Sequence, residues 1–178
     1  MRVVIVVESK HGSTRAIAEV VGDEIRKAGL EASIVDADAT DIALDGYDAA
    51  VIGSAVYVGR WMKNARVFLE ANRETLRTMP LWMFSSGPLK EGSERPDDLA
   101  EVRAFAADVH ARDSRIFAGS LDKADLSLAE RAAVRMVHAP YGDAREWDEI
   151  RSWAKAISAE LTVSSSSTST PPSRTARS

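Results

Sequence analysis

The sequence predicts an α/β protein with three layers, in which helices cover both faces of a five-stranded parallel sheet. Two observations lead to this prediction. Short apolar runs typical of buried strands alternate with longer stretches whose apolar residues recur at helical spacing. Strands alternating with helices of this length indicate parallel βαβ units. Right-handed crossovers and this regular alternation favour the strand order 2-1-3-4-5.

The five strands are expected at regular intervals along the chain. The first run, RVVIVV at residues 2–7, is β-branched from Val3 onward and typical of a strand buried on both faces. The other strands are predicted at 31–35, 47–56, 80–86 and 114–121.

The helices are expected between and after these strands. From Ser13 to about Ala28 apolar residues recur at helical spacing, and Gly29 stands where a helix stop belongs. Further helices are predicted at 62–76, 97–111, 127–138 and 147–161.

The composition fits a single folded domain. The chain has 178 residues, of which 45% are hydrophobic and 28% are charged, as in an ordinary globular protein with a proper core. This domain is expected over residues 1–162. The remainder, 163–178, is rich in Ser, Thr and Pro and has no apolar periodicity, so we expect a disordered tail without a role of its own.

The composition also excludes several kinds of function. A net charge of -4 argues against a nucleic-acid partner, which would require a basic face. The absence of cysteine excludes disulfides, thiolate nucleophiles and sulfur-ligated metals. No metal site is predicted, because His11, His110 and His138 lie far apart and form no ligand pair at helical spacing. Any redox chemistry must then come from a bound organic cofactor.

The chain is expected to be cytoplasmic. Its first predicted strand begins at residue 2, which leaves no room for a signal peptide. No apolar run approaches the ~20 residues of a membrane span, so no integral membrane segment is predicted.

Three loops carry the features that indicate a ligand site. In a parallel sheet, ligands bind beyond the carboxyl ends of the strands, where the strand order reverses. The loops at that place follow the first, third and fourth predicted strands.

The first loop is SKHGST, residues 9–14. Ser9, Ser13 and Thr14 offer hydroxyl groups, and Gly12 lets the backbone approach a ligand closely. The N–H groups of the first helical turn point into the same space, which favours an anion. The loop matches neither the ATP-type phosphate loop nor the dinucleotide fingerprint. Composition alone favours an anion site only slightly over a plain helix N-cap by Ser13, with Gly12 as a turn residue.

The second loop is IGSAVYVGRW, residues 52–61. Small residues at 53–55 leave space at the strand end, and the aromatic residues Tyr57 and Trp61 follow. Taken alone, these two residues are more often packing aromatics that cap the sheet. The third loop lies in FSSGPLKEGSERP, residues 84–96, and taken alone it is typical of an ordinary surface loop.

Together the three loops resemble those of flavodoxins. Ser9-x-x-Gly12-x-Thr14 is similar to the flavodoxin phosphate loop, usually Ser/Thr-x-Thr-Gly-x-Thr, with His11 where flavodoxins usually have Thr. The resemblance spans residues 1 to about 161 and implies a flavodoxin-like three-layer sandwich that binds FMN. The second and third loops resemble those that flank the flavin ring, which would then carry the chemistry without a catalytic side chain. The cofactor-binding residues implied are Ser9, Lys10, His11, Gly12, Ser13, Thr14, Ser54, Ala55, Val56, Tyr57, Val58, Gly59, Ser85, Ser86 and Gly87.

Within this superfamily the sequence most resembles the menaquinone-dependent protoporphyrinogen oxidase family. The similar stretches are SKHGSTRAIA, YDAAVIGSAVYVGRW, IFAGSL and EWDEIRSWAKAI. After the fifth strand that family carries a basic and aromatic insertion thought to meet porphyrin or the membrane. The segment 122–149 is instead acidic at its start and end, so we expect Arg131, Arg135 and His138 to lie on a solvated helix face.

These resemblances imply an FMN-dependent oxidoreductase that passes electrons between a small organic donor, protoporphyrinogen among the candidates, and a quinone. Two alternatives stay open, a flavodoxin-type electron carrier between redox proteins and a binding module of the same fold without flavin. A carrier usually has a strongly acidic rim around the flavin edge, whereas Lys10, Arg60 and Lys63 flank these loops. Peripheral membrane contact and the oligomeric state stay open as well.

The topology also predicts where the flavin ring would lie. We expect it between the loops 54–61 and 85–92, with one edge toward the segment 122–149, because neighbouring strand ends surround one crevice. Substrate or quinone would then enter over Tyr57 and Trp61.

Overall fold

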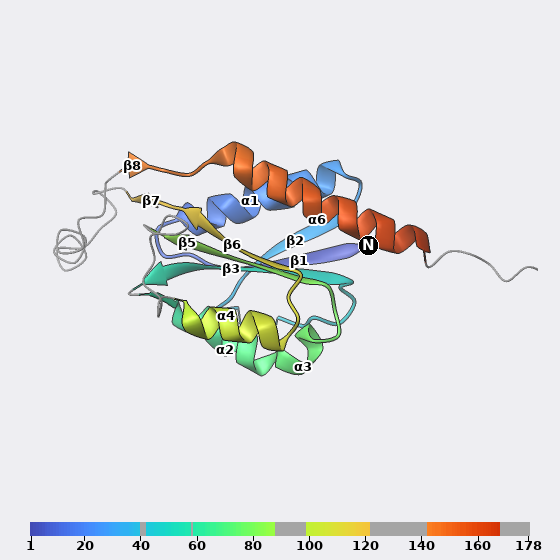
Figure 1. Cartoon of the computed structure of the whole chain (residues 1–178), viewed down its shortest axis with the longest axis horizontal. Helices are drawn as coiled ribbons and strands as arrows, with labels where there is room; N and C mark the ends of the chain where they lie inside the picture. The colour runs from blue at the N-terminus through green and yellow to red at the C-terminus, as the bar shows by residue number, and fades with distance from the viewer. Residues whose placement is uncertain (40–41, 58, 88–98, 122–141, 168–178) are drawn as a thin grey trace, which may run out of the picture.

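The computed structural model describes residues 1–39, 42–57, 59–87, 99–121 and 142–167. They form three layers around a central sheet (Figure 1). One face of the sheet is covered by α1 (Ser13–Lys27) and α6 (Trp147–Ser167). The other face is covered by α2 (Lys63–Ala71), α3 (Arg73–Leu76) and α4 (Ala100–Asp108).

The central sheet has the strand order predicted from the sequence. Its parallel strands lie in the order β2-β1-β3-β5-β6, which is 2-1-3-4-5 when these five strands are numbered among themselves. Their bounds are β1 (Arg2–Glu8), β2 (Glu31–Asp36), β3 (Ala49–Tyr57), β5 (Leu81–Gly87) and β6 (Asp113–Ala118). A two-residue strand, β4 (Arg60–Trp61), was not predicted and pairs antiparallel with β3. A separate antiparallel pair is formed by β7 (Ser120–Leu121) and β8 (Gly142–Asp143).

The first strand is buried on both faces, as its β-branched run predicts. Val4 and Val6 belong to the apolar cluster beneath α2 and α4, whereas Val3, Ile5 and Val7 belong to the one beneath α1 and α6. All five side chains are fully buried. Because successive side chains of a strand point to opposite faces, β1 joins the two halves of the core.

Three predicted helices end elsewhere than expected. The helix predicted over 97–111 ends at Asp108, three residues early. The stretch 62–76 is divided at Asn72, whose side-chain amide donates to the Phe68 carbonyl oxygen over 2.9 Å and so competes with the helix ladder. The last helix continues past Leu161 to Ser167, so the predicted end is wrong by more than one turn. It takes in the first serines of the segment predicted to be disordered. The rest of the tail and the predicted helix 127–138 lie outside the described residues.

An aromatic cluster fills the space between the sheet and α6. The rings of Phe84, Phe117 and Trp153 lie 5.4–6.1 Å apart in tilted and edge-to-face arrangements. The Phe84 ring lies directly over Gly53 of the neighbouring strand, where an added Cβ would come within 2.1 Å of Phe84 Cζ. The space at Gly53, which the sequence suggested was left for a ligand, is therefore filled by packing.

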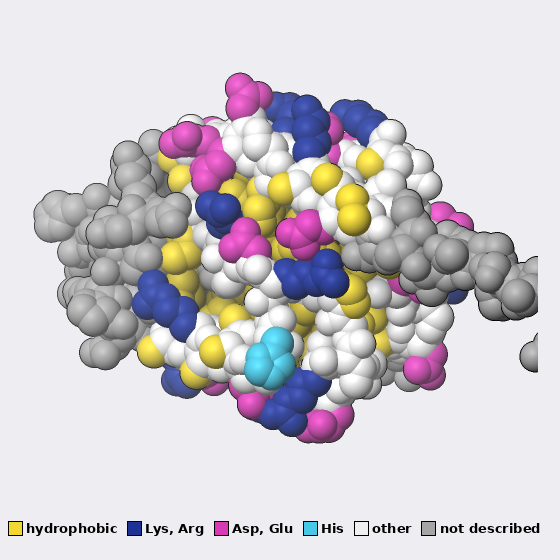
Figure 2. All heavy atoms as spheres, turned by 45° about the vertical axis from the view of Figure 1, so that its right-hand side comes forward, with side chains coloured by type: hydrophobic (Ala, Val, Ile, Leu, Met, Phe, Trp, Pro, Cys, Tyr) yellow, Lys and Arg dark blue, Asp and Glu magenta, His cyan; other side chains and the backbone are white. Residues whose placement is uncertain are grey.

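The described surface mixes charges of both signs. On the face shown in Figure 2, Lys and Arg side chains are interspersed with Asp and Glu. Several of the ion pairs join residues three apart on one helix, such as Arg26 with Asp23 and Arg151 with Asp148. Exposed pairs of this kind contribute little to stability. Among the described residues, no helix is long and apolar enough to cross a bilayer.

One surface cluster joins two helices and should make stability depend on pH. Asp108 at the end of α4 accepts a hydrogen bond from Arg77 over 2.6 Å and another from Arg73. The Arg77 hydrogen bond, followed by that of Arg73, holds the pKa of Asp108 below its usual 3.8. A carboxylate with a lowered folded-state pKa contributes stability above its unfolded-state pKa, and loses it as pH falls through the folded-state value.

Asp108→Asn should therefore lower the free energy of unfolding at pH 7, and the difference from wild type should disappear as pH falls well below 3.8. Urea unfolding at a series of pH values measures this difference. Asp23→Asn is the matched control, because its exposed carboxylate pairs with Arg26 three residues further along the same helix. A pH-independent loss in Asp108→Asn would contradict the assignment.

Candidate cofactor site

The three loops singled out in the sequence meet at one edge of the sheet. β1, β3 and β5 are parallel neighbours, so their carboxyl ends lie together. At these ends Glu8 is in register with Ser54, and Ala55 with Ser86. Residues 9–14 therefore begin beside the end of β3, which in turn lies beside the end of β5. This is the edge at which α/β sheets bind ligands.

The loop 9–14 has the features of an anion site. The Ser9 hydroxyl oxygen is buried and has no hydrogen-bond partner in the protein. Gly12 has φ +77°, a conformation that favours glycine, and a Cβ there would meet nothing within 4 Å. Thr14 is 1% exposed in the first turn of α1, where N–H groups have no partner within the helix. A buried hydroxyl without a partner, beside open space and a helix start, fits a phosphate group.

Ser13 does not cap α1. The N-cap is Gly12, and the Ser13 hydroxyl oxygen instead accepts a hydrogen bond from the Ser120 amide over 2.8 Å. The alternative interpretation of this loop, a plain N-cap by Ser13, is therefore wrong. Because a hydroxyl that accepts one bond still has its own hydrogen to donate, Ser13 remains a candidate donor to a ligand.

The two aromatic residues of the second loop have different surroundings. Tyr57 is 39% exposed, and the Lys10 ammonium lies 5.7 Å from the centre of its ring. Trp61 is 2% exposed, belongs to the core cluster beneath α2 and α4, and donates its indole N–H to the Ser85 hydroxyl over 2.8 Å. The expectation that Trp61 lines the entrance is therefore wrong, whereas Tyr57 lies at the surface of the site.

The turn after Tyr57 is a tight hairpin. Tyr57 is paired with Arg60, and Gly59 between them has φ +72°. The Gly59 carbonyl oxygen accepts a hydrogen bond from the Leu99 amide over 2.8 Å, which ties the hairpin to the start of α4. Val58 lies outside the described residues.

The predicted residues at the end of β3 are largely engaged by the protein. The buried Ser54 hydroxyl accepts from the Met62 amide over 3.1 Å and donates to the Ala55 carbonyl over 2.9 Å. Val56 is buried in the core, and Ala55 is half-buried. Ser54 therefore holds the start of α2 against the sheet, and its predicted contact with a cofactor stays a prediction.

The sequence reasoning missed Glu8. This carboxylate is only 9% exposed, and it accepts a hydrogen bond from the Ala65 amide over 2.6 Å in the first turn of α2. A negative charge at a helix N-terminus is favourable, so Glu8 stabilises the helix that follows the hairpin. An acidic residue at the end of a wholly apolar strand was the available signal.

The end of β5 is closely packed. Ser85 accepts from Trp61, and Ser86 is 2% exposed. A Cβ on Gly87 would lie 3.3 Å from Val56 Cβ, so glycine allows the two strand ends to approach. Residues 88–92 of the predicted third loop, and most of the segment 122–149, lie outside the described residues.

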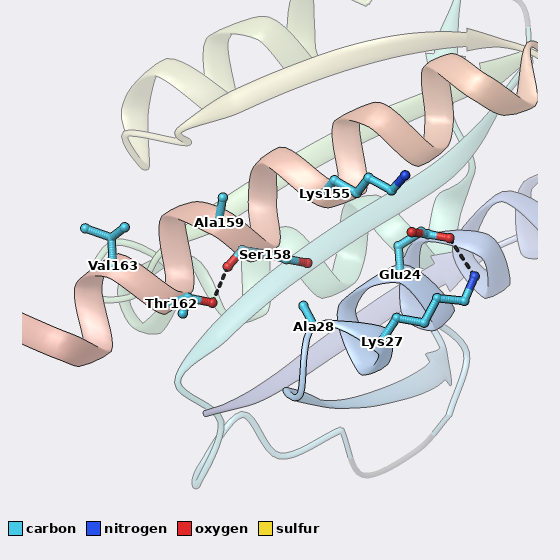
Figure 3. Close-up of a pocket in the computed structure, with 8 residues that line it drawn as sticks. All are labelled: Glu24, Lys27, Ala28, Lys155, Ser158, Ala159, Thr162 and Val163. Carbon is cyan, nitrogen blue, oxygen red and sulfur yellow. Dashed lines mark hydrogen bonds and ion pairs between the residues drawn. The ribbon is translucent and has the colours of Figure 1, made fainter.

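A groove between α1 and α6 is a separate feature. Figure 3 shows Ala28, the residue after α1, facing Ser158 of α6 across it, while Lys27 is paired with Glu24. Lys27 belongs to the last turn of α1, whereas the candidate anion site lies at its first turn. The groove therefore lies at the opposite end of α1.

Comparison with known proteins identifies the family. The family model described as "Flavodoxin domain" matches residues 4–148. The chain belongs to the flavodoxin domain family. This flavodoxin-like chain is also 22% identical over 171 residues to protoporphyrinogen IX dehydrogenase [quinone] of Escherichia coli strain K12, covering 88% of the chain and 94% of that enzyme. The resemblance to the protoporphyrinogen oxidase family drawn from the sequence is thus confirmed.

Solved structures support the flavodoxin-like fold. A flavodoxin from the domain Archaea superposes with a TM-score of 0.61 at 16% identity, covering 91% of this chain and 99% of that one. A point mutant of flavodoxin from Pseudomonas aeruginosa gives 0.58 at 18% identity, with the same coverage of both chains. At these identities the likeness concerns the fold.

Proposed function

We propose that the protein is an FMN-dependent oxidoreductase that passes electrons between a small organic substrate and a quinone. The observation that carries this proposal is the buried Ser9 hydroxyl without a protein partner, beside Gly12 and the first turn of α1. Hydroxyl and amide donors at a helix start suit the phosphate of FMN without a metal or a lysine.

The residues of the site would divide the cofactor between them. Ser9, Ser13 and Thr14 would donate to the phosphate, and Gly12 gives the backbone room to approach it. Tyr57 would offer its exposed ring to the flavin. Bound FMN supplies the redox chemistry by accepting and releasing electrons. The protein's part is to hold and orient the cofactor and to decide what reaches it.

Charge around the site favours a small-molecule substrate over a carrier role. Lys10 and Lys63 are exposed at this edge, and Arg60 and Arg66 share a single carboxylate, that of Glu101. The described rim is therefore basic in a chain of net charge -4. Similarity to the E. coli enzyme supports protoporphyrinogen as the substrate and a quinone as the acceptor.

The deciding experiment is to purify the protein and record its visible spectrum. We expect a yellow protein that releases one FMN per chain on denaturation. Anaerobic assays with protoporphyrinogen and menaquinone should then give turnover, compared with a nicotinamide donor in parallel. A colourless protein that does not take up FMN would contradict the proposal and favour a binding module of the same fold without flavin. A yellow protein active with neither donor would favour an electron carrier.

Thr14→Ala should weaken FMN binding by about 1–3 kcal/mol, the cost of leaving a charged acceptor without a donor. Lys10→Ala should do less, because the Lys10 ammonium lies over the Tyr57 ring and an exposed charge is screened by salt. Titration of apoprotein with FMN, followed by flavin fluorescence quenching, measures both affinities. Thr75→Ala, at an exposed threonine of α3, is the control. The reverse ranking would mean that point charge holds the phosphate.

A further inference from the structure

The short strands β7 and β8 connect the first and third loops of the site. The Ser120 amide donates to the Ser13 hydroxyl, and Arg145, just after β8, directs Nη1 to the Ser13 carbonyl oxygen at 3.5 Å. From the same segment, the Gly119 amide donates to the Gly87 carbonyl oxygen over 2.8 Å. The first residue of α1 is therefore held from outside its own helix, on both its side chain and its backbone.

The Arg145 side chain is firmly fixed, and it is only 13% exposed. Its guanidinium forms a forked pair with Asp143, Nε to Oδ1 at 2.8 Å and Nη2 to Oδ2 at 2.7 Å. The same group lies 4.4 Å from the centre of the Trp147 ring. The Arg145 hydrogen bond in turn holds the pKa of Asp143 below its usual value. A forked and stacked arginine has little freedom to move.

The Arg145 guanidinium lies near the start of α1, where a positive charge by itself does not stabilise the helix. A positive charge near a helix N-terminus is unfavourable, because the helix dipole is positive there. The Asp143 carboxylate offsets that charge, so the Arg145–Asp143 pair has no net charge with which to destabilise the helix. What the arrangement adds is geometry, because hydrogen-bonding groups from β7 and from the residues after β8 meet at Ser13.

We propose that Arg145 is a positioning residue that, with Ser120, fixes the first turn of α1 so that its donors stay directed at the anion. Asp143 and Trp147 hold the guanidinium in place for this task. The inference rests on the proposed FMN site, since the anion is taken to be its phosphate. It goes beyond that proposal by assigning a role to residues that no part of the chain's resemblance to flavodoxins implies.

The test compares Arg145→Ala and Arg145→Lys with Arg151→Ala, whose arginine forms an exposed pair on α6. Affinities for FMN and for riboflavin, which lacks the phosphate, are measured by fluorescence titration. Hydrogen exchange of the Ala16 and Ile17 amides, the first with acceptors at the helix start, is measured in the FMN-free protein. We expect Arg145→Ala to lose about tenfold in FMN affinity, the size of one lost hydrogen-bonded contact. Riboflavin affinity should stay within about twofold, because only the phosphate contacts are affected.

Exchange of the Ala16 and Ile17 amides should be faster in Arg145→Ala, while Arg151→Ala should match wild type in every measurement. Arg145→Lys keeps the positive charge but loses the two-bond pairing with Asp143. Its FMN affinity and its exchange rates should therefore lie between those of Arg145→Ala and wild type. Equal losses for FMN and riboflavin, or unchanged exchange of the Ala16 and Ile17 amides, would overturn the proposal. If Arg145→Ala does not fold, the same affinities and exchange rates are measured for Arg145→Lys and Asp143→Asn. If wild type binds no FMN, the proposed function fails, and the exchange measurement still decides whether Arg145 positions the helix start.

Discussion

Trp61→Ala should lower the free energy of unfolding by about 3–5 kcal/mol, the range for removing a large aromatic side chain from a core. The indole is 2% exposed and packs within the cluster beneath α2 and α4. Its loss would also leave the Ser85 hydroxyl without the N–H donor it now has at 2.8 Å. Urea unfolding of the FMN-free protein measures the change without any contribution from the cofactor.

Tyr57→Ala is the matched variant, because Tyr57 lies four residues away in the same hairpin but is 39% exposed. It should cost no more than about 1 kcal/mol in unfolding free energy, as for a surface substitution. It should weaken FMN binding by about 0.5–1.5 kcal/mol, the scale of an aromatic contact. A large stability loss in Tyr57→Ala, or a small one in Trp61→Ala, would reverse the assignment of the two aromatics.

Gly53→Ala should destabilise the protein by about 3 kcal/mol, the upper part of the range for overfilling a core. An alanine Cβ would lie 2.1 Å from Phe84 Cζ, and the ring is held on its other sides by Phe117 and Trp153. Because neither backbone nor ring has free space to move into, the clash must displace one strand or break the aromatic contacts. Urea unfolding measures the loss.

Two further variants separate crowding from backbone strain. Gly29→Ala introduces a Cβ that meets nothing within 4 Å but keeps a φ of +81°, so it should cost only about 1–2 kcal/mol. Combining Gly53→Ala with Phe84→Leu should cost less than the sum of the single changes, because the smaller side chain makes room for the Cβ. Strict additivity of that pair would show that the clash is not the cause.

The fold could be predicted because local pattern and topology agree. The β-branched run of the first strand, the helical spacing after Ser13 and the regular alternation leave few other arrangements of five parallel strands. Helix ends were less predictable. The break at Asn72 depends on one side-chain hydrogen bond, and the continuation to Ser167 crosses residues of low helix propensity.

The sequence could predict where the candidate site lies, but not the role of each side chain in it. Strand ends and small residues indicate where loops converge, and the resemblance to flavodoxins assigns the loop 9–14. What a side chain does once there depends on neighbours distant in the sequence. Ser54 meets the start of α2, Trp61 meets Ser85, and Arg145 reaches Ser13 from 132 residues away. No local pattern encodes such contacts, so packing and positioning roles were mistaken or missed.

The pairing of Leu121 with Gly142 has a consequence for how this protein can diversify. Paired strands lie about 5 Å apart, so Leu121 and Gly142, the described residues on either side of 122–141, are neighbours in space. With the two ends already joined, each doubling of the length between them adds only about 0.6 kcal/mol of closure entropy. The entropy of closing the chain therefore sets little limit on the length of a segment inserted between these two residues. A single scaffold could acquire new substrates at this junction while its loop 9–14 stays unchanged.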